Sequence, residues 1–236
     1  YRRSRFVFVE IFFIVRNLPA CEIVSSFFEA GIHDGRFYVS ASRKNHGNHH
    51  RQAWYGCACC PSNVCRFIPS IGSYIYGTSK NALWVNLYVG NEAKFKVGRR
   101  EVEVSMQTTY PWHGDVSLTF QKDYKGEVRL RIPGWCKNFS ISKNNEETKE
   151  YTVDRGYAVL QGKWAKDDCI SLTLDMPVEL VEADPNVKAD QGLRAIQRGP
   201  LVYCAEQIDN VENFEQLAVS KGMEWDLVDV QMMGGI

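Results

Sequence analysis

The sequence lacks three features that would each restrict its class: a net charge, an apolar run of membrane length and an internal repeat. Its 28 Lys and Arg residues balance 28 Asp and Glu residues, so no overall field attracts nucleic acid or an anionic membrane. The apolar run Phe6–Val15 is too short to span a bilayer. We therefore expect neither nucleic acid nor a membrane as a partner. The 236 residues suffice for one large domain or two smaller ones.

Cysteine is abundant, and its distribution is uneven. Four of the eight cysteines are clustered, whereas the others lie singly among apolar residues: Cys57, Cys59, Cys60 and Cys65 against Cys21, Cys136, Cys169 and Cys204. Eight cysteines could form four disulfides in an oxidising compartment. The scattered four are better explained as buried free thiols, which favours a cytoplasmic protein.

The N-terminal residues offer an alternative localisation. Arginines precede Phe6–Val15 and the segment Leu18–Cys21 follows it, which imitates a bacterial lipoprotein signal. However, Glu10 interrupts the run, Pro19 suits a cleavage site poorly, and there is no initiating Met. We therefore expect a helix that remains from a larger α domain, with periplasmic or lipoprotein export as the alternative.

Two adjacent cysteines, Cys59 and Cys60, lie in the stretch W-Y-G-C-A-C-C-P-S-N. Preferred disulfide geometry separates α-carbons by about 5.5 Å, whereas chain neighbours lie about 3.8 Å apart. Neighbouring thiolates can instead face one soft cation, and Zn²⁺ is the common case. The sequence therefore predicts a zinc site here. By residue type alone, it could also be a structural site closed by four thiols: Cys57, Cys59, Cys60 and Cys65.

A helix is predicted to follow the cysteines, over roughly Pro61–Tyr76. Pro61 suits the first helical turn because its missing N–H has no partner there in any case. Apolar residues then recur at spacings of three and four: Val64, Phe67, Ile68, Ile71 and Ile75. The thiol pair would lie at the helix N-terminus, where the dipole and the free amides favour a thiolate.

Further along the chain, short runs of β-branched and aromatic residues replace the helical spacing. Seven such runs are Ala82–Val89, Val102–Met106, Val116–Phe120, Glu127–Ile132, Phe139–Ser142, Tyr157–Leu160 and Cys169–Leu174. Turns are expected between them, for example at Lys125-Gly126 and Asn144-Asn145, a pattern typical of an antiparallel β-sandwich. Another β segment begins near Pro177 or Val187 and includes Leu201–Cys204. The fold class is therefore mixed α and β, mainly β.

The cysteine stretch, the following S-I-G-S-Y-I-Y-G and three later motifs together resemble one known family. The later motifs are Tyr110–Trp112, Leu130–Trp135 and Gln197–Tyr203. In this order they resemble glycoside hydrolase family 127, the β-L-arabinofuranosidase family, over roughly residues 31–236. The resemblance implies that residues 1–77 end an (α/α)6 barrel, that 78–180 form a β-sandwich, and that 181–236 begin a second sandwich.

The same resemblance implies a mechanism and a substrate class. Cys59 would be the nucleophile of a retaining glycosidase, and Cys59 and Cys60 would bind Zn²⁺. The carbohydrate substrate would be β-L-arabinofuranose or a related sugar in plant-type glycans. His49 and His50 could bind a sugar hydroxyl, although without a partner residue the sequence favours a solvated loop. Trp54 could form a wall of a sugar subsite or pack beneath the thiols.

The chain departs from the family pattern in one respect. The family has two further zinc ligands in a Glu-x-Cys motif upstream of the adjacent cysteines, and its acid/base Glu lies further upstream. No Glu-x-Cys motif precedes Cys57 here. We therefore expect a partial chain that is inactive alone. The rival hypothesis is a zinc-stabilised β-sandwich module that binds carbohydrate or is structural, without hydrolysis. Assembly into a homo-oligomer stays open.

Overall fold

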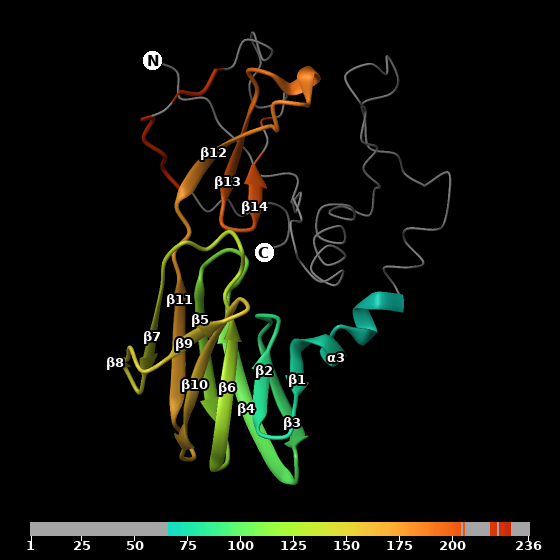
Figure 1. Cartoon of the computed structure of the whole chain (residues 1–236), viewed down its shortest axis with the longest axis vertical. Coiled ribbons are helices and arrows are strands. Elements are labelled where there is room, and N and C mark those ends of the chain that lie inside the picture. The colour runs from blue at the N-terminus through green and yellow to red at the C-terminus, as the bar shows by residue number, and fades with distance from the viewer. Residues whose placement is uncertain (1–65, 204, 206–217, 221, 228–236) are drawn as a thin grey trace.

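The computed structural model describes residues 66–203, 205, 218–220 and 222–227, which form a two-sheet β-sandwich with a smaller sheet beyond one of its ends (Figure 1). The mainly β fold class is therefore confirmed. No helix among these residues is long and apolar enough to cross a membrane. The expected division at 1–77, 78–180 and 181–236 stays a prediction, and residues 1–65 of the expected barrel segment lie outside the described ranges.

A short helical segment leads into the sandwich. Arg66 and Phe67 are helical, a 3-10 turn (η1) covers Ile68–Ser70, and helix α3 covers Gly72–Ile75. The helix predicted over Pro61–Tyr76 is thus confirmed where the chain is described, but it is irregular and ends one residue early, because strand β1 already begins at Tyr76. Pro69 explains the irregularity, since it lacks the N–H that a regular α-helix needs at that position.

One sheet of the sandwich has five strands in the order β1-β2-β6-β10-β9. Their bounds are Tyr76–Thr78, Ala82–Val85, Tyr124–Arg131, Tyr157–Trp164 and Thr152–Asp154 respectively. Strands β2 and β6 pair in parallel, with Ala82 opposite Glu127 and Val85 opposite Leu130. The other pairs in this sheet are antiparallel, as expected.

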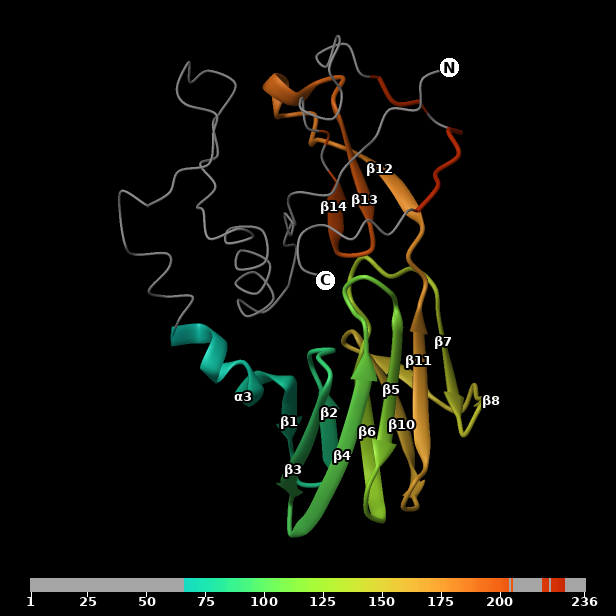
Figure 2. The same ribbon diagram turned by 180° about the vertical axis from the view of Figure 1, so that it is seen from behind.

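The second sheet has six strands in the order β3-β4-β5-β11-β7-β8 and faces the first sheet (Figure 2). Their bounds are Asn91–Val97, Arg100–Thr108, Asp115–Phe120, Cys169–Leu174, Phe139–Lys143 and Glu146–Glu147. Sequence analysis missed β3, which reads N-E-A-K-F-K-V and places several charges on an edge strand. Such charges are typical of edges that avoid pairing with another chain.

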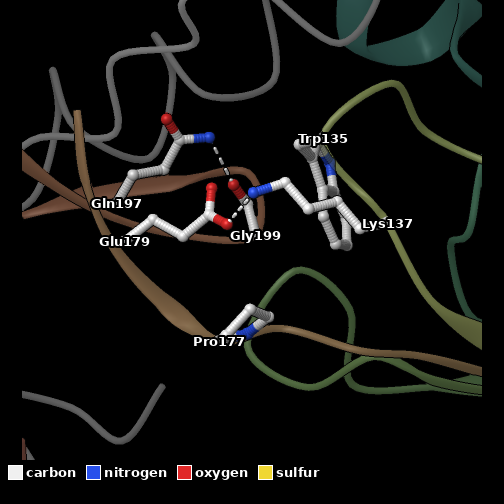
Figure 3. Close-up of a pocket in the computed structure, with 6 residues that line it drawn as sticks. All are labelled: Trp135, Lys137, Pro177, Glu179, Gln197 and Gly199. Carbon is white, nitrogen blue, oxygen red and sulfur yellow. Dashed lines mark hydrogen bonds and ion pairs between the residues drawn. The ribbon is translucent and has the colours of Figure 1, made fainter. Parts of the chain in front are cut away.

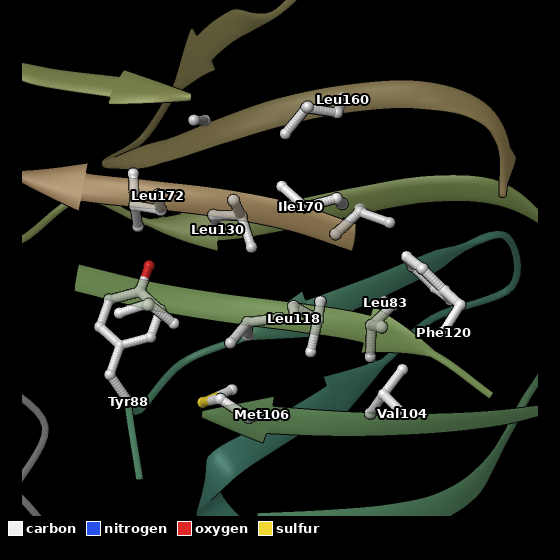
Figure 4. Close-up of a cluster of buried hydrophobic side chains, with 14 of the residues drawn as sticks. Leu83, Tyr88, Val104, Met106, Leu118, Phe120, Leu130, Leu160, Ile170 and Leu172 are labelled. Atoms are coloured by element: carbon white, nitrogen blue, oxygen red, sulfur yellow. The ribbon is translucent and has the colours of Figure 1, made fainter. Parts of the chain in front are cut away.

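The core lies between the two sheets and is filled by alternate residues of each strand (Figure 4). In β5, for example, Val116, Leu118 and Phe120 are buried, whereas the residues between them are partly exposed. The Phe120 ring stacks on Tyr124 and Trp164, with centroid distances of 5.9 and 5.4 Å. This alternation arises because successive side chains of a strand point to opposite faces of its sheet.

The two expected turns had different outcomes. Asn144 and Asn145 have φ values of 51° and 69° and connect β7 to β8, so this turn is confirmed. The turn at Lys125-Gly126 is wrong, because both residues lie inside β6. Gly126 serves close packing instead: a Cβ there would lie 2.3 Å from the Tyr124 hydroxyl oxygen.

The smaller sheet consists of β12 (Val178–Glu182), β13 (Arg194–Arg198) and β14 (Leu201–Tyr203), with a 3-10 turn (η2) at Lys188–Asp190. All its described pairs are antiparallel. The further β segment expected to begin near Pro177 and to include residue 201 is therefore confirmed. It follows β11 after a short connection and lies beyond the end of the sandwich (Figure 1).

Candidate functional site

The residues that sequence analysis assigned to a site all precede the described part of the chain. They are Cys59 and Cys60 as zinc ligands, Cys59 also as nucleophile, and His49, His50 and Trp54 as sugar contacts. Their roles stay predictions. Within the described ranges, no group of three or more His, Cys, Asp or Glu side chains could hold a metal ion. The structure does describe the helical segment from Arg66, six residues after Cys60, to Ile75, together with the groups that bond to its C-terminal end.

The sandwich holds the end of α3 through Asn86, which follows β2. The backbone N–H of Asn86 donates to the Ile75 carbonyl at 2.8 Å, and its side-chain Nδ2 donates to the Tyr74 carbonyl at 3.4 Å. The last carbonyls of a helix have no partner inside the helix, so both bonds supply what α3 cannot supply itself. The Oδ1 of Asn86 accepts a hydrogen bond of 2.9 Å from the Tyr157 hydroxyl of β10.

Aromatic and charged side chains fix Tyr157 in turn. The Tyr157 ring meets Trp84 edge to face at a centroid distance of 5.0 Å, and the Arg129 guanidinium lies 4.2 Å from the Trp84 ring centroid. Arg129 forms ion pairs with Glu127 and with Asp154, the latter at 2.9 Å. Glu127, followed by Asp154, raises the pKa of Arg129, and Arg129 lowers the pKa of Asp154.

A second contact holds the start of β1. The Tyr76 hydroxyl donates to Asn91 Oδ1 at 3.1 Å, and the Tyr76 ring packs on Phe95 at a centroid distance of 5.0 Å. Burial raises the pKa of Tyr76 to about 12, although the hydrogen bond with Asn91 acts in the opposite direction. The phenol therefore stays neutral at physiological pH, and the chain leaves the helix from a fixed point on the sandwich.

The three later sequence motifs meet at the end of the sandwich that faces the small sheet. Tyr110 precedes a cis peptide bond to Pro111, and its ring lies between Tyr88 at 5.9 Å and Trp135 at 6.5 Å, measured between centroids. The Tyr88 hydroxyl donates to the backbone carbonyl of the buried Arg131. Sequence analysis missed Tyr88 because the run Ala82–Val89 resembled a single strand, whereas β2 ends at Val85.

The third motif joins the small sheet to this cluster. Arg198 donates a hydrogen bond from its Nη1 to the Trp112 carbonyl at 2.7 Å. Gly199 has a φ of +57°, and a Cβ there would lie 2.6 Å from Met176 Cε, so only glycine fits without displacing Met176. In the structure, Leu130–Trp135 and Gln197–Tyr203 are strand ends that meet turns at Gly134-Trp135 and Gly199-Pro200.

A shallow pocket lies at this junction (Figure 3), lined by Trp135, Lys137, Pro177, Glu179, Gln197 and Gly199. Lys137 and Glu179 form an ion pair across it, and Gln197 donates to the Gly199 carbonyl at 2.7 Å. Trp135 Nε1 is buried and has no hydrogen-bond partner among the described groups. The one carboxylate in this lining is paired with Lys137, and the lining includes neither a thiol nor a second carboxyl that could act as a nucleophile. The pocket therefore does not have the chemistry of a glycosidase centre.

Comparisons with known proteins match both the sandwich and the small sheet. A family model described as beta-L-arabinofuranosidase, GH127 middle domain, matches residues 82–176, and the glycoside hydrolase family 127 C-terminal domain matches 178–231. A non-reducing end beta-L-arabinofuranosidase of Bifidobacterium longum subsp. longum is 36% identical over 174 residues, which are 71% of this chain and 26% of that protein.

Solved structures of the same family superpose on the chain. A GH127 beta-L-arabinofuranosidase from Geobacillus stearothermophilus T6 is 37% identical with a TM-score of 0.66, covering 73% of this chain and 29% of its own. A second GH127 beta-arabinofuranosidase gives 37% identity and a TM-score of 0.66 over 74% and 30% respectively. The chain thus spans between a quarter and a third of the length of these relatives.

Proposed function

This chain belongs to glycoside hydrolase family 127, and we propose that it is part of a retaining glycosidase that releases β-L-arabinofuranose from plant-type glycans. The relatives whose names state this activity, or β-arabinofuranosidase activity more generally, support the substrate class. We further propose that residues 1–77 form the end of an (α/α)6 barrel. The observation that carries the proposal is the order of features along the chain. The adjacent thiols precede a helical segment in the sequence, and this segment leads directly into a sandwich of this family.

The proposed reaction is a double displacement at the anomeric carbon. The Cys59 thiolate attacks, a C–S bond forms, and the C–O bond to the leaving group breaks while an acid/base carboxyl protonates the departing oxygen. In the second step, the same carboxyl, now a base, takes a proton from water. The water oxygen attacks, the C–S bond breaks and the thiolate returns. Two inversions give overall retention.

The thiol cluster fits a zinc ion by the chemistry of its donors. Adjacent thiols suit a soft divalent cation, and the predicted place ahead of a helix favours their ionised form. Cys59 and Cys60 would hold the ion, which when bound keeps a thiolate deprotonated at neutral pH. An unperturbed cysteine has a pKa of about 8.5 and would be mostly protonated there.

Two substitutions test the proposal in an active protein that contains this chain. Cys59→Ser should abolish turnover of an aryl β-L-arabinofuranoside, because a serine hydroxyl gives little nucleophile at neutral pH. Cys57→Ser is the matched control and should cost much less, since no chemical role is assigned to Cys57. Equal losses from both changes, together with equal losses of zinc, would instead indicate a structural site closed by four thiols.

The 236-residue chain alone gives a second test. Because no Glu-x-Cys motif precedes Cys57, we expect weak zinc binding and no release of arabinose. General acid–base catalysis alone is typically worth about 10²–10⁴-fold in rate, so a missing carboxyl is easily detected. Stoichiometric zinc with enzyme-level turnover would show that these residues themselves supply the remaining groups.

A further inference from the structure

We propose that Asn86 is a positioning residue for the nucleophile Cys59. It would act through the helical segment Arg66–Ile75, which lies between the two residues in the sequence. This inference rests on the proposed function only for its catalytic consequence. Asn86 lies on the sandwich but bonds to two carbonyls at the end of α3, those of Tyr74 and Ile75. It therefore links the family sandwich to the segment that continues from Cys59 and Cys60.

The orientation of the Asn86 amide is determined by its partners. The Nδ2 faces the Tyr74 carbonyl, which only accepts, and the Oδ1 faces the Tyr157 hydroxyl, which can donate. Reversing the amide would bring two oxygen acceptors together at Tyr74. The Tyr74 carbonyl thus selects the amide orientation, and the Tyr157 hydroxyl holds the amide in that orientation by donating to Oδ1.

Neighbouring side chains on the sandwich hold Tyr157 in place. Its ring rests against Trp84, which Arg129 covers, and Arg129 is itself held by Glu127 and Asp154. These residues come from β2, β6 and β10, and Asp154 comes from the neighbouring β9. We call Asn86 together with this support the clamp, and its support is built on paired strands. Sites supported by strands hold geometry more precisely than sites supported by loops.

The helical segment itself is weakly determined by its own bonds. Its described part consists of the helical residues Arg66 and Phe67, a 3-10 turn and a four-residue helix. Hydrogen bonds such as Ile71 N–H to Ile68 O at 3.2 Å and Tyr74 N–H to Ile71 O at 2.9 Å join these pieces. Short helices are marginal without tertiary contacts. The hydrogen bonds at Tyr74 and Ile75 are therefore expected to set the direction of the described segment, and we infer that this influence extends along the chain to Cys60 and Cys59, which precede Tyr74 by 14 and 15 residues.

The test compares Asn86→Leu and Tyr157→Phe in an active protein that contains this chain. Asn86→Leu removes the side-chain hydrogen bonds at similar volume, and Tyr157→Phe removes only the hydroxyl that donates to the amide oxygen. We expect hydrogen exchange of amides 72–76 to rise roughly five- to tenfold in the first and less in the second, as for the loss of one or two ordinary hydrogen bonds. We expect kcat to fall by about tenfold with KM and zinc content unchanged, because a nucleophile displaced by a fraction of an ångström reacts slowly.

Matched controls separate positioning from general loss of stability. Asn138→Leu removes a hydrogen bond of the same 3.4 Å length, which the Asn138 side-chain amide donates to Asp175. Tyr151→Phe alters a half-buried tyrosine whose ring packs on Phe139. Neither should change exchange at 72–76 or kcat. Should Asn86→Leu fail to fold, Tyr157→Phe still decides the matter, because it leaves Asn86 in place.

The outcomes distinguish this inference from the function on which it rests. Faster exchange at 72–76 with unchanged kcat, or faster exchange throughout the sandwich, would overturn positioning by Asn86. Turnover that survives Cys59→Ser would overturn the proposed nucleophile while the exchange result still reports the clamp. Faster local exchange, a lower kcat and unchanged controls would establish the proposal.

Discussion

The hydroxyl of Tyr88 donates a hydrogen bond to the backbone carbonyl of Arg131, and both residues are buried. This bond ties the chain after β2 to the end of β6, beside the turn that carries Trp135. Tyr88→Phe keeps the ring and removes only the donor. We predict a loss of about 1–2 kcal/mol in the free energy of unfolding, the usual cost of leaving a buried group without its partner. Urea denaturation checks this, with Tyr151→Phe as a control expected to change little.

The pH dependence of that pair follows from the burial of the phenol. Burial raises the pKa of Tyr88 well above its usual value. A group whose pKa is raised by folding contributes its full stability below the unfolded value, about 10 for tyrosine, and loses it as the pH rises further. The difference in the free energy of unfolding between wild type and Tyr88→Phe should therefore be constant from pH 6 to 9 and become smaller above pH 10. A difference that varies between pH 6 and 9 would contradict this assignment.

Asp168 should stabilise the sandwich in the opposite pH direction. Its carboxylate accepts from Asn144 Nδ2 at 2.8 Å and from the Ala165 N–H at 3.0 Å, and pairs with Lys143 at 3.0 Å. The bond from Asn144, followed by these other contacts, lowers the pKa of Asp168. Such a group stabilises the fold above its unfolded pKa of about 3.9 and loses this contribution as the pH falls through the lower folded value.

Asp168→Asn should therefore cost about 1–2 kcal/mol at pH 7, as expected for hydrogen bonds to a charged group. The cost should disappear as the pH falls through the lowered folded pKa of Asp168, because wild type then also loses the charge. Unfolding by urea at several pH values checks this. Asp167→Asn, one residue away, is the control and should cost less at pH 7.

Gly114 should tolerate no side chain. A Cβ at this position would lie 2.0 Å from the Leu174 backbone oxygen, and the Leu174 N–H donates to the Gly114 carbonyl at 2.9 Å. Gly114→Ala should therefore separate β11 from the loop before β5 and cost at least about 2 kcal/mol. Gly134→Ala is a sharp control, since nothing lies within 4 Å of its added Cβ and the change should stay within about 0.5 kcal/mol. Similar thermal denaturation midpoints for the two variants would contradict the packing described.

Cys136 should be a slow nucleophile. Burial raises the pKa of its thiol, and the Sγ lies 3.0 Å from the Asn138 carbonyl oxygen as a hydrogen-bond donor. Less thiolate at pH 7.5 means slower alkylation. We predict that iodoacetamide labels Cys136 several-fold more slowly in the folded chain than in urea, as measured by peptide mass spectrometry. Equal rates in the two states would show that the thiol is neither shielded nor held.

Local pattern determined how well each strand could be predicted. Strands such as β5 and β11 alternate cleanly, so their bounds followed from the sequence, whereas β3 carries Lys and Glu and was missed. The parallel pairing of β2 with β6 could not be foreseen, because register between distant strands depends on the whole core. Lys125-Gly126 resembled a turn only because the packing that requires Gly126 is not visible in the local sequence.

The candidate site divides in the same way. The motifs around Tyr110, Trp135 and Gly199 were identified from the sequence as family motifs, and the structure adds that they meet at one junction. Asn86 was not singled out, since an asparagine after a strand carries no signal until its partners Tyr74 and Tyr157 are known. The roles of Cys59 and Cys60 stay predictions.

The parallel pairing of β2 with β6 also constrains the order in which the chain can fold during synthesis. The described partners of β2 are β1, which precedes it, and β6, which ends at Arg131. A two-stranded β1–β2 ribbon is marginal alone, so it gains a lasting place only after residues up to 131 have emerged. Tyr157 emerges later still. Cys59 and Cys60 are therefore synthesised well before Asn86 and Tyr157 can together hold the end of α3, which must wait until the strands that carry these two residues have formed.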